Sequence, residues 1–95
     1  MNLQQNLAYT MAGLNEAYND GTLPDYLNNC LEIEYTKNLA GDLKGVIVLV
    51  VFGGPNIYIN TGTGKIEAFA AGEYDDVDLT PEVAEEIENI VMEFI

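Results

Sequence analysis

Apolar side chains recur at helical spacing near the start of the chain. One stripe with a period of about 3.6 residues holds Leu3, Leu7, Met11, Leu14 and Tyr18. The stripe predicts an amphipathic helix over residues 3–18. The polar run Asn19-Asp20-Gly21 then ends the helix, with Gly21 as a left-handed cap. Residues 22–29 predict a short helical turn with Pro24 near its start.

The middle of the chain changes to the period of two that is typical of strands. In residues 31–37 apolar residues alternate with Glu32 and Glu34, which predicts a half-buried strand with an acidic outer face. Residues 46–52 are continuously apolar, so we expect a central strand that is covered on both faces. Two more strands are expected at 57–61 and 66–71, and the connecting loop and turns at 38–45, 53–56 and 62–65.

The C-terminal part begins with an acidic segment and ends in a second helix. Residues 72–79 predict an irregular acidic link. Thr80 and Pro81 then form a strong helix start, because threonine caps helices and proline suits the first helical position. The apolar stripe of this helix holds Val83, Ile87, Ile90, Val91 and Phe94. The opposite stripe is almost purely acidic, with Glu82, Glu86, Asn89 and Glu93, and it is flanked by Glu85 and Glu88.

These elements predict the α+β class and a single domain over residues 1–95. We expect an N-terminal helix, a short helical turn, a four-stranded antiparallel meander and a C-terminal helix, with the helices packed on one face of the sheet. The turns "GGPN" and "TGTGK" are not phosphate-binding loops, because neither leads into a helix. For Tyr58 and Phe69 we favour core packing, with an aromatic contact in a polar interface as the alternative.

Charge changes this picture more than any other property of the composition. The 95 residues include 48% hydrophobic residues, enough for a core, yet the formal net charge is −13. Residues 66–95 hold ten acids and no basic residue. Such a chain repels nucleic acids and anionic membrane surfaces, so we expect basic protein partners and no direct nucleic-acid or membrane binding.

The absent residue types exclude several chemistries. The sequence has no histidine, serine, arginine or tryptophan, which removes the usual Ser–His and Cys–His nucleophile pairs. We therefore expect neither enzymatic activity nor a cofactor, although an enzyme using one of the many carboxylate pairs is an alternative. Cys30 is the single cysteine, and we expect it to be a buried hydrophobe in a cytoplasmic protein. Residues 1–20 have no signal-peptide pattern, and the apolar run 46–52 is too short to span a bilayer.

The acidic residues near the C-terminus are the candidate partner-binding site. Like charges four residues apart, such as Glu82 and Glu86, destabilise a helix, and no lysine relieves them. A plain solvated face is the alternative. Asp75, Asp76 and Asp78 could bind Ca²⁺ or Mg²⁺ through their oxygens, but their spacing does not match a calcium loop, and we expect no metal. The full set of candidate residues is Glu73, Tyr74, Asp75, Asp76, Asp78, Glu82, Glu85, Glu86 and Glu93, supported by Glu32 and Glu34.

The stretch "VFGGPNIYINTGTGKIEAF" (51–69), followed by a short acidic helix, resembles small proteins of phages and mobile elements. In its small size, acidity and α+β pattern the whole chain is similar to anti-CRISPR proteins. That resemblance implies a non-enzymatic inhibitor in the bacterial host cytoplasm, monomeric or homodimeric, which binds the basic DNA-reading surface of a CRISPR effector subunit by acidic mimicry. The alternative is an acidic structural or adaptor protein of phage or bacterial origin that acts by protein–protein or homodimer contacts.

Overall fold

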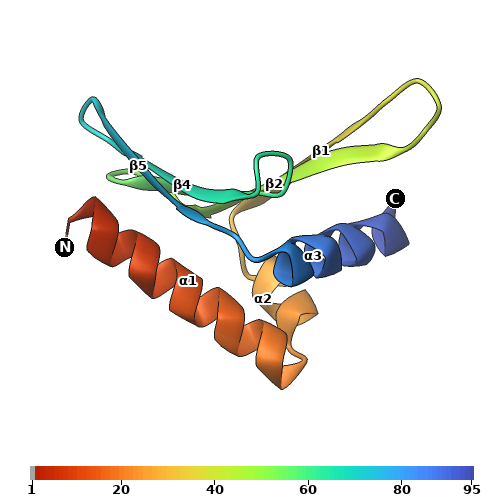
Figure 1. Cartoon of the computed structure of the whole chain (residues 1–95), viewed down its shortest axis with the longest axis horizontal. Coiled ribbons are helices and arrows are strands. Elements are labelled where there is room, and N and C mark those ends of the chain that lie inside the picture. The colour runs from red at the N-terminus through yellow and green to blue at the C-terminus, as the bar shows by residue number, and fades with distance from the viewer. Residues whose placement is uncertain (1) are drawn as a thin grey trace.

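The computed structural model describes residues 2–95, and it forms an α+β fold with two layers (Figure 1). The strands that it describes make one antiparallel meander in the order β1-β2-β3-β4-β5. The elements in chain order are α1 (Leu3–Asp20), α2 (Leu23–Asn28), β1 (Glu32–Lys37), β2 (Leu43–Val51), β3 (Asn56–Asn60), β4 (Lys65–Ala70), β5 (Glu73–Asp78) and α3 (Pro81–Phe94).

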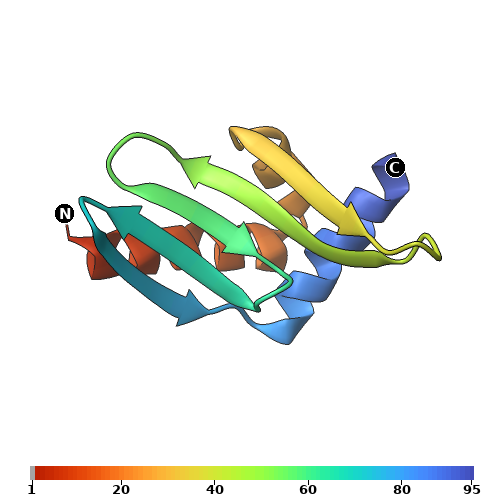
Figure 2. The same ribbon diagram turned by 90° about the horizontal axis from the view of Figure 1, so that it is seen from above.

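The helices cover one face of the sheet and leave the other face open. Figure 2 shows α1 behind β4 and β5, and α3 crossing behind β2, in agreement with their contacts. The core lies between the two layers. Its fully buried side chains from the sheet are Val46, Val48, Ile57, Ile59, Ile66 and Ala68, and those from the helices are Leu7, Leu14 and Ile87.

The α1 helix is confirmed and extends to Asp20. Asn2 and Gln5 form a capping box in which each side chain accepts a hydrogen bond from the backbone N–H of the other. Gly21 takes the left-handed conformation expected of the C-terminal cap. Tyr18 was expected to continue the buried stripe, but it is 37% exposed, and Ala17 is buried in its place.

The α3 helix starts at Pro81 as predicted, but two side chains near its ends, Thr80 and Phe94, differ from the expectation. The Thr80 side chain makes no capping hydrogen bond within the described residues. The stripe of Val83, Ile87, Ile90 and Val91 is buried as expected. Phe94 is not buried, with 78% of its surface exposed, and Figure 2 shows the last turn of α3 emerging beyond β1.

The expectation of an irregular link over residues 72–79 is wrong, because residues 73–78 form the fifth strand, β5. Its residues pair with β4 from Ala70 opposite Glu73 to Lys65 opposite Asp78. Ala71 and Gly72 both have positive φ values, 49° and 81°, which is the backbone of a tight two-residue hairpin. Aspartate and glutamate are depleted in strands, so the composition of this segment hid its conformation.

Two expectations about strand burial are also wrong. We expected residues 46–52 to be covered on both faces, but only the helix side of β2 is covered, and Ile47 is 37% exposed. We expected β1 to be half-buried, but each of its six residues is exposed. The reason is visible in Figure 1, where the β1–β2 hairpin rises away from α3. The β2 strand also begins at Leu43, inside the predicted loop.

Smaller features complete the fold. Cys30 is only partly buried, against the expectation of full burial, and its thiol donates a hydrogen bond of 3.3 Å to the Tyr26 carbonyl oxygen. A Cβ on Gly45 would stand 3.2 Å from the Gly62 Cα, so a larger residue there would be tightly packed against the β3–β4 turn. None of the helices in the described part of the chain has the length and apolar character needed to cross a bilayer.

Candidate protein-binding site

The strand register determines which side chains point away from the helices. Residues opposite each other on paired strands share a face, and Val48 and Ile59 point into the core. Their strand neighbours Leu49 and Tyr58, which also lie opposite each other, therefore point to the other side. Extending the register gives the open face, whose members include Glu32, Glu34, Ile47, Leu49, Asn56, Tyr58, Asn60, Lys65, Glu67, Phe69, Tyr74, Asp76 and Asp78.

An apolar band crosses the open face, and we define it as Ile47, Leu49, Tyr58, Phe69 and Tyr74. The Tyr58 and Phe69 rings meet edge to face, with 6.0 Å between centroids. The Phe69 and Tyr74 rings lie 4.9 Å apart with a tilt of 53°. Core packing was expected for Tyr58 and Phe69, and this is wrong, because both lie on the open face and Phe69 is 42% exposed. Their position on the open face is compatible with the alternative, an aromatic contact in a polar interface, which stays a prediction.

Carboxylates lie on both sides of the apolar band. Glu32 and Glu34 are on β1, next to Leu49 and Ile47 on β2. On the opposite side lies a second group of carboxylates, which consists of Glu67 on β4 together with Asp76 and Asp78 on β5. We call these five residues the flanking acids. The β1 and β5 acids, far apart in the sequence, are thus brought onto one face by the strand order.

Lys65 is the one basic side chain that the described residues place on the open face, and two flanking acids engage it. Its Nζ lies 3.0 Å from Oδ1 of Asp78 and 3.5 Å from Oδ1 of Asp76. These contacts raise the pKa of Lys65, chiefly through the hydrogen bond to Asp78. Because the ammonium is already paired, it offers little to an anionic ligand.

Tyr74 and Asp76 form a short hydrogen bond that fixes both side chains. The Tyr74 hydroxyl donates to Oδ2 of Asp76 at 2.6 Å. This bond is the main cause that lowers the pKa of Asp76 and that raises the pKa of Tyr74 to about 12. Asp76 is therefore ionised at neutral pH, and the Tyr74 ring is held beside Phe69.

Glu32 and Glu34 are neighbours on the open side of β1, and their proximity has an electrostatic cost. A shared hydrogen bond with Glu34, together with repulsion between the carboxylates, raises the pKa of Glu32. Both residues are exposed, so water screens this repulsion. A cation placed between them by a partner would remove it.

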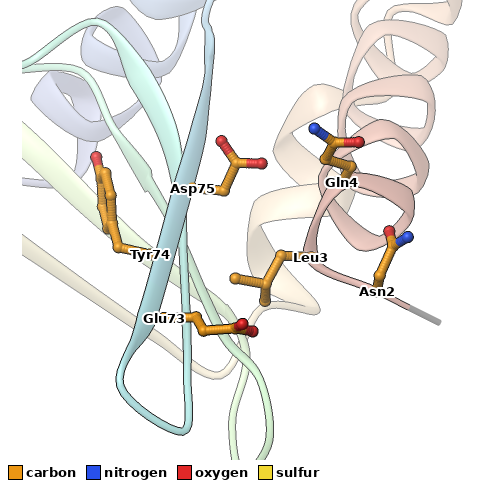
Figure 3. A pocket seen from close by; sticks show the side chains of 6 residues that line it. All are labelled: Asn2, Leu3, Gln4, Glu73, Tyr74 and Asp75. Atoms are coloured by element: carbon orange, nitrogen blue, oxygen red, sulfur yellow. The ribbon is translucent and has the colours of Figure 1, made fainter.

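Glu73 and Asp75 do not belong to the open face. Figure 3 shows both side chains on the side of β5 that faces α1, while Tyr74 points away. They line a hollow of about 430 Å³ with Asn2, Leu3 and Gln4. Since Asp75 is on the opposite side of β5 from Asp76 and Asp78, these three do not converge on a metal ion. Residues 2–95 contain no group of three or more acids or cysteines that is arranged to hold one.

The α3 acids form a separate surface on the helix layer. Glu82, Glu85, Glu86 and Glu93 are exposed on the helix, whose apolar stripe faces the sheet. Glu88 is engaged, because its Oε2 accepts a hydrogen bond of 2.8 Å from the Thr61 hydroxyl. The candidate residues therefore fall into three places, the open face, the hollow beside α1 and the exposed side of α3.

Sequence reasoning missed Glu67, Lys65, Ile47 and Leu49 as members of the site. The sequence could have placed Glu67 and Lys65 on the open face, because they alternate along β4 with Ile66 and Ala68, which are apolar and point into the core. The sequence could not have placed Ile47 and Leu49 there, because all residues of the run 46–52 are apolar and the run does not show which face of the strand is covered.

Comparison with known proteins adds no relative from which a function can be transferred. No protein-family model matches the chain, and no characterised protein or solved structure is similar enough to count as a match. The functional argument therefore depends on the geometry of the open face and on the charge of the chain.

Proposed function

We propose that this protein is a non-enzymatic inhibitor that binds a basic, nucleic-acid-binding surface of another protein and thereby prevents that protein from binding DNA. One observation carries the proposal. The open face presents an apolar band between two groups of carboxylates, and its lysine is already paired. A face of this kind is unsuited to nucleic acid and complementary to a surface rich in lysine and arginine.

The sheet holds the carboxylates in a fixed array. Carboxylates opposite each other on neighbouring strands, such as Glu67 and Asp76, start from backbones about 4.8 Å apart, and those two residues apart on one strand from backbones about 6.7 Å apart. A groove that binds phosphates through lysine and arginine accepts such an array by charge. The apolar band adds a contact that a phosphate backbone lacks, so the inhibitor can bind more tightly than non-specific DNA does.

The target class that we propose is a CRISPR effector in the cytoplasm of a bacterial host. The support is the resemblance of the small, acidic α+β chain to anti-CRISPR proteins, together with a net charge of −13. CRISPR effectors hold DNA in positively charged channels, which suits an acidic competitor.

The test is a competition experiment with purified, guide-loaded CRISPR effectors. Fluorescent target DNA is bound to each effector, and the protein is titrated in at about 50 mM and about 300 mM salt. The proposal predicts that at least one effector releases its DNA, and that the affinity of the protein for this effector, measured without DNA, falls at least tenfold at the higher salt. An affinity for the effector that does not depend on salt, or no release from any effector, refutes acidic competition.

An adaptor role is the second candidate, and a separate apolar groove favours it. The groove lies between α2, β1 and the end of α3, with a volume of about 240 Å³, and Ile33, Tyr35 and Phe94 line it. These side chains are 38%, 47% and 78% exposed. Binding through this groove would persist at high salt, and it would be lost in Tyr35→Ser rather than in variants of the flanking acids.

A further inference from the structure

We infer that the open face receives a basic amphipathic α-helix of the partner, which lies along the apolar band with its lysine or arginine side chains reaching the flanking acids. The inference rests on the proposed function, and it names the part of the partner that is bound. It assigns the interface to the sheet rather than to the α3 acids.

The register sets the direction of the apolar band. Leu49 and Tyr58 lie opposite each other on β2 and β3, and Phe69 and Tyr74 lie opposite each other on β4 and β5. Phe69 is two residues beyond Glu67, the residue opposite Tyr58, so the band shifts along the strands as it crosses the sheet. The band is therefore a diagonal, from Ile47 on β2 to Tyr74 on β5.

The flanking acids lie on either side of this diagonal. Glu32 and Glu34 border its β2 end, opposite Leu49 and Ile47. Glu67 and Asp76 lie one step along the strands from Phe69 and Tyr74, on the other side. An elongated apolar ligand on the diagonal thus meets carboxylates at its β2 end and along the side of Glu67 and Asp76.

The dimensions of the face match a helix. Five strands at a spacing of about 4.8 Å give a face about 19 Å wide between its edge strands. An α-helix with side chains is about 10–12 Å in diameter, so a helix on the diagonal crosses β2 to β5, covers the apolar band and leaves the acids beside the band accessible. Lysine and arginine side chains are long enough to pack along an apolar surface and still present their charge at its rim.

Charge complementarity selects a basic partner over a second copy of the chain. Among residues 2–95 the open face carries five carboxylates and one paired lysine. Two such faces placed together would confront carboxylates with carboxylates, a repulsion that natural interfaces avoid. The exposed rings of Phe69 and Tyr74 also accept cations above their faces, which again favours lysine and arginine.

The experiment uses two synthetic peptides of about 18 residues with the same leucine and lysine composition. One places leucine on a single helical stripe, and the other is a scrambled isomer without a stripe. Each is titrated into the isotope-labelled protein, and binding is followed by amide chemical shifts at about 50 mM salt. We expect the striped peptide to bind at least tenfold more tightly and its shifts to centre on β2, β3 and β4.

Two matched double variants locate the interface. Leu49→Thr with Phe69→Thr removes apolar groups from the band but keeps residues that strands favour. Tyr9→Gln with Met92→Gln removes exposed apolar groups from the helix layer and is the control. We expect the first pair to weaken binding of the striped peptide at least tenfold and the second pair to leave it within about twofold.

The result also separates this inference from the proposed function. Equal binding of both peptides, or shifts centred on α3, overturns the helix-binding face, and the wild-type protein supplies this outcome even if a variant fails to fold. Peptide binding on the band without DNA release from any effector supports the face and removes the inhibitor function. DNA release that survives the Leu49→Thr and Phe69→Thr pair supports inhibition and overturns the assignment to this face.

Discussion

Thr61 joins the sheet to α3 through two hydrogen bonds of one hydroxyl group. Its Oγ1 accepts from the backbone N–H of Val46 on β2 at 2.8 Å, and it donates to Oε2 of Glu88 on α3 at 2.8 Å. The substitution Thr61→Val keeps the shape and removes both bonds. It therefore measures how firmly the layer with the α3 acids is held against the open sheet.

The expected loss in the free energy of unfolding can be worked out from the two hydrogen bonds of the Thr61 hydroxyl. Val46 is fully buried, so its N–H is left without a partner, at a cost of about 1–3 kcal/mol. A hydrogen bond to a charged group is worth about 1.5–3 kcal/mol, but the half-buried Glu88 regains water, and only part of this is lost. We expect the free energy of unfolding to fall by about 2 kcal/mol, out of about 5–15 kcal/mol for a typical domain.

Urea denaturation followed by circular dichroism measures this change. With a slope of about 1–3 kcal/mol per molar urea, the midpoint should fall by about 0.7–2 M. Thr63→Val is the matched control, because the exposed Thr63 hydroxyl only donates a 3.3 Å bond to the Asn60 carbonyl, and its effect should be within about 0.5 kcal/mol. A Thr61→Val midpoint equal to that of the control would refute the role given to this hydroxyl.

Three further predictions concern the β5 hairpin and the charged groups of the open face. Ala71→Gly should raise the free energy of unfolding by up to about 1 kcal/mol, because alanine has a positive φ of 49° there; a lower urea midpoint would contradict this. Tyr74→Phe should raise the pKa of Asp76 in a carbon NMR titration, because the hydroxyl is the main cause of its lowered pKa. A lowered carboxyl pKa stabilises the fold at pH values above the pKa of the unfolded chain, and this stabilisation is lost as the pH falls through the pKa of the folded protein. The Tyr74→Phe variant should therefore lose less stability on acidification than the wild type. An unchanged pKa of Asp76 in the variant would contradict the role given to the Tyr74–Asp76 hydrogen bond. Glu32→Gln should be more stable than the wild type at pH 7 and low salt, because the raised pKa of the Glu32 carboxyl destabilises the fold above that pKa. The gain in stability should vanish below the pKa of Glu32 in the unfolded chain. A gain that persists at pH 3 would contradict repulsion by Glu34.

The two long helices were predictable because the burial of one apolar face determines the spacing of apolar residues in each of them. The stripe from Leu7 to Leu14 and the stripe from Val83 to Val91 both face a core, so helical spacing was enough to place the two long helices. The β5 strand was not predictable in this way. Its backbone is held by pairing with β4 and by the contacts of Lys65 and Phe69, which a local pattern of acids does not reveal.

The site was predictable in its residue types more than in its arrangement. The sequence drew attention to the acids of 73–93 and to Glu32 and Glu34, and charge alone was sufficient for that. Their division among the open face, the hollow beside α1 and the exposed side of α3 depends on strand order and on the alternation of side chains within β5, which are tertiary properties. The apolar band was hidden for another reason. Ile47 and Leu49 look like core residues in any sequence, although here they are on the face that the helices leave open.

The central claim is that the acids of the open face, rather than acidity in general, compete with DNA for a basic protein surface. Two charge-matched variants test it. Glu32→Gln, Glu34→Gln, Glu67→Gln and Asp78→Asn remove four of the five flanking acids, and Glu82→Gln, Glu85→Gln, Glu86→Gln and Glu93→Gln remove four of the five acids of α3. Each set raises the net charge from −13 to −9, because four carboxylates become amides.

The decisive measurement is the concentration of each variant that releases half of the target DNA from a CRISPR effector inhibited by the wild type. The account predicts that the open-face variant needs at least tenfold more protein, whereas the α3 variant stays within about twofold of the wild type. Equal potency of the two variants, or a larger loss in the α3 variant, would contradict it.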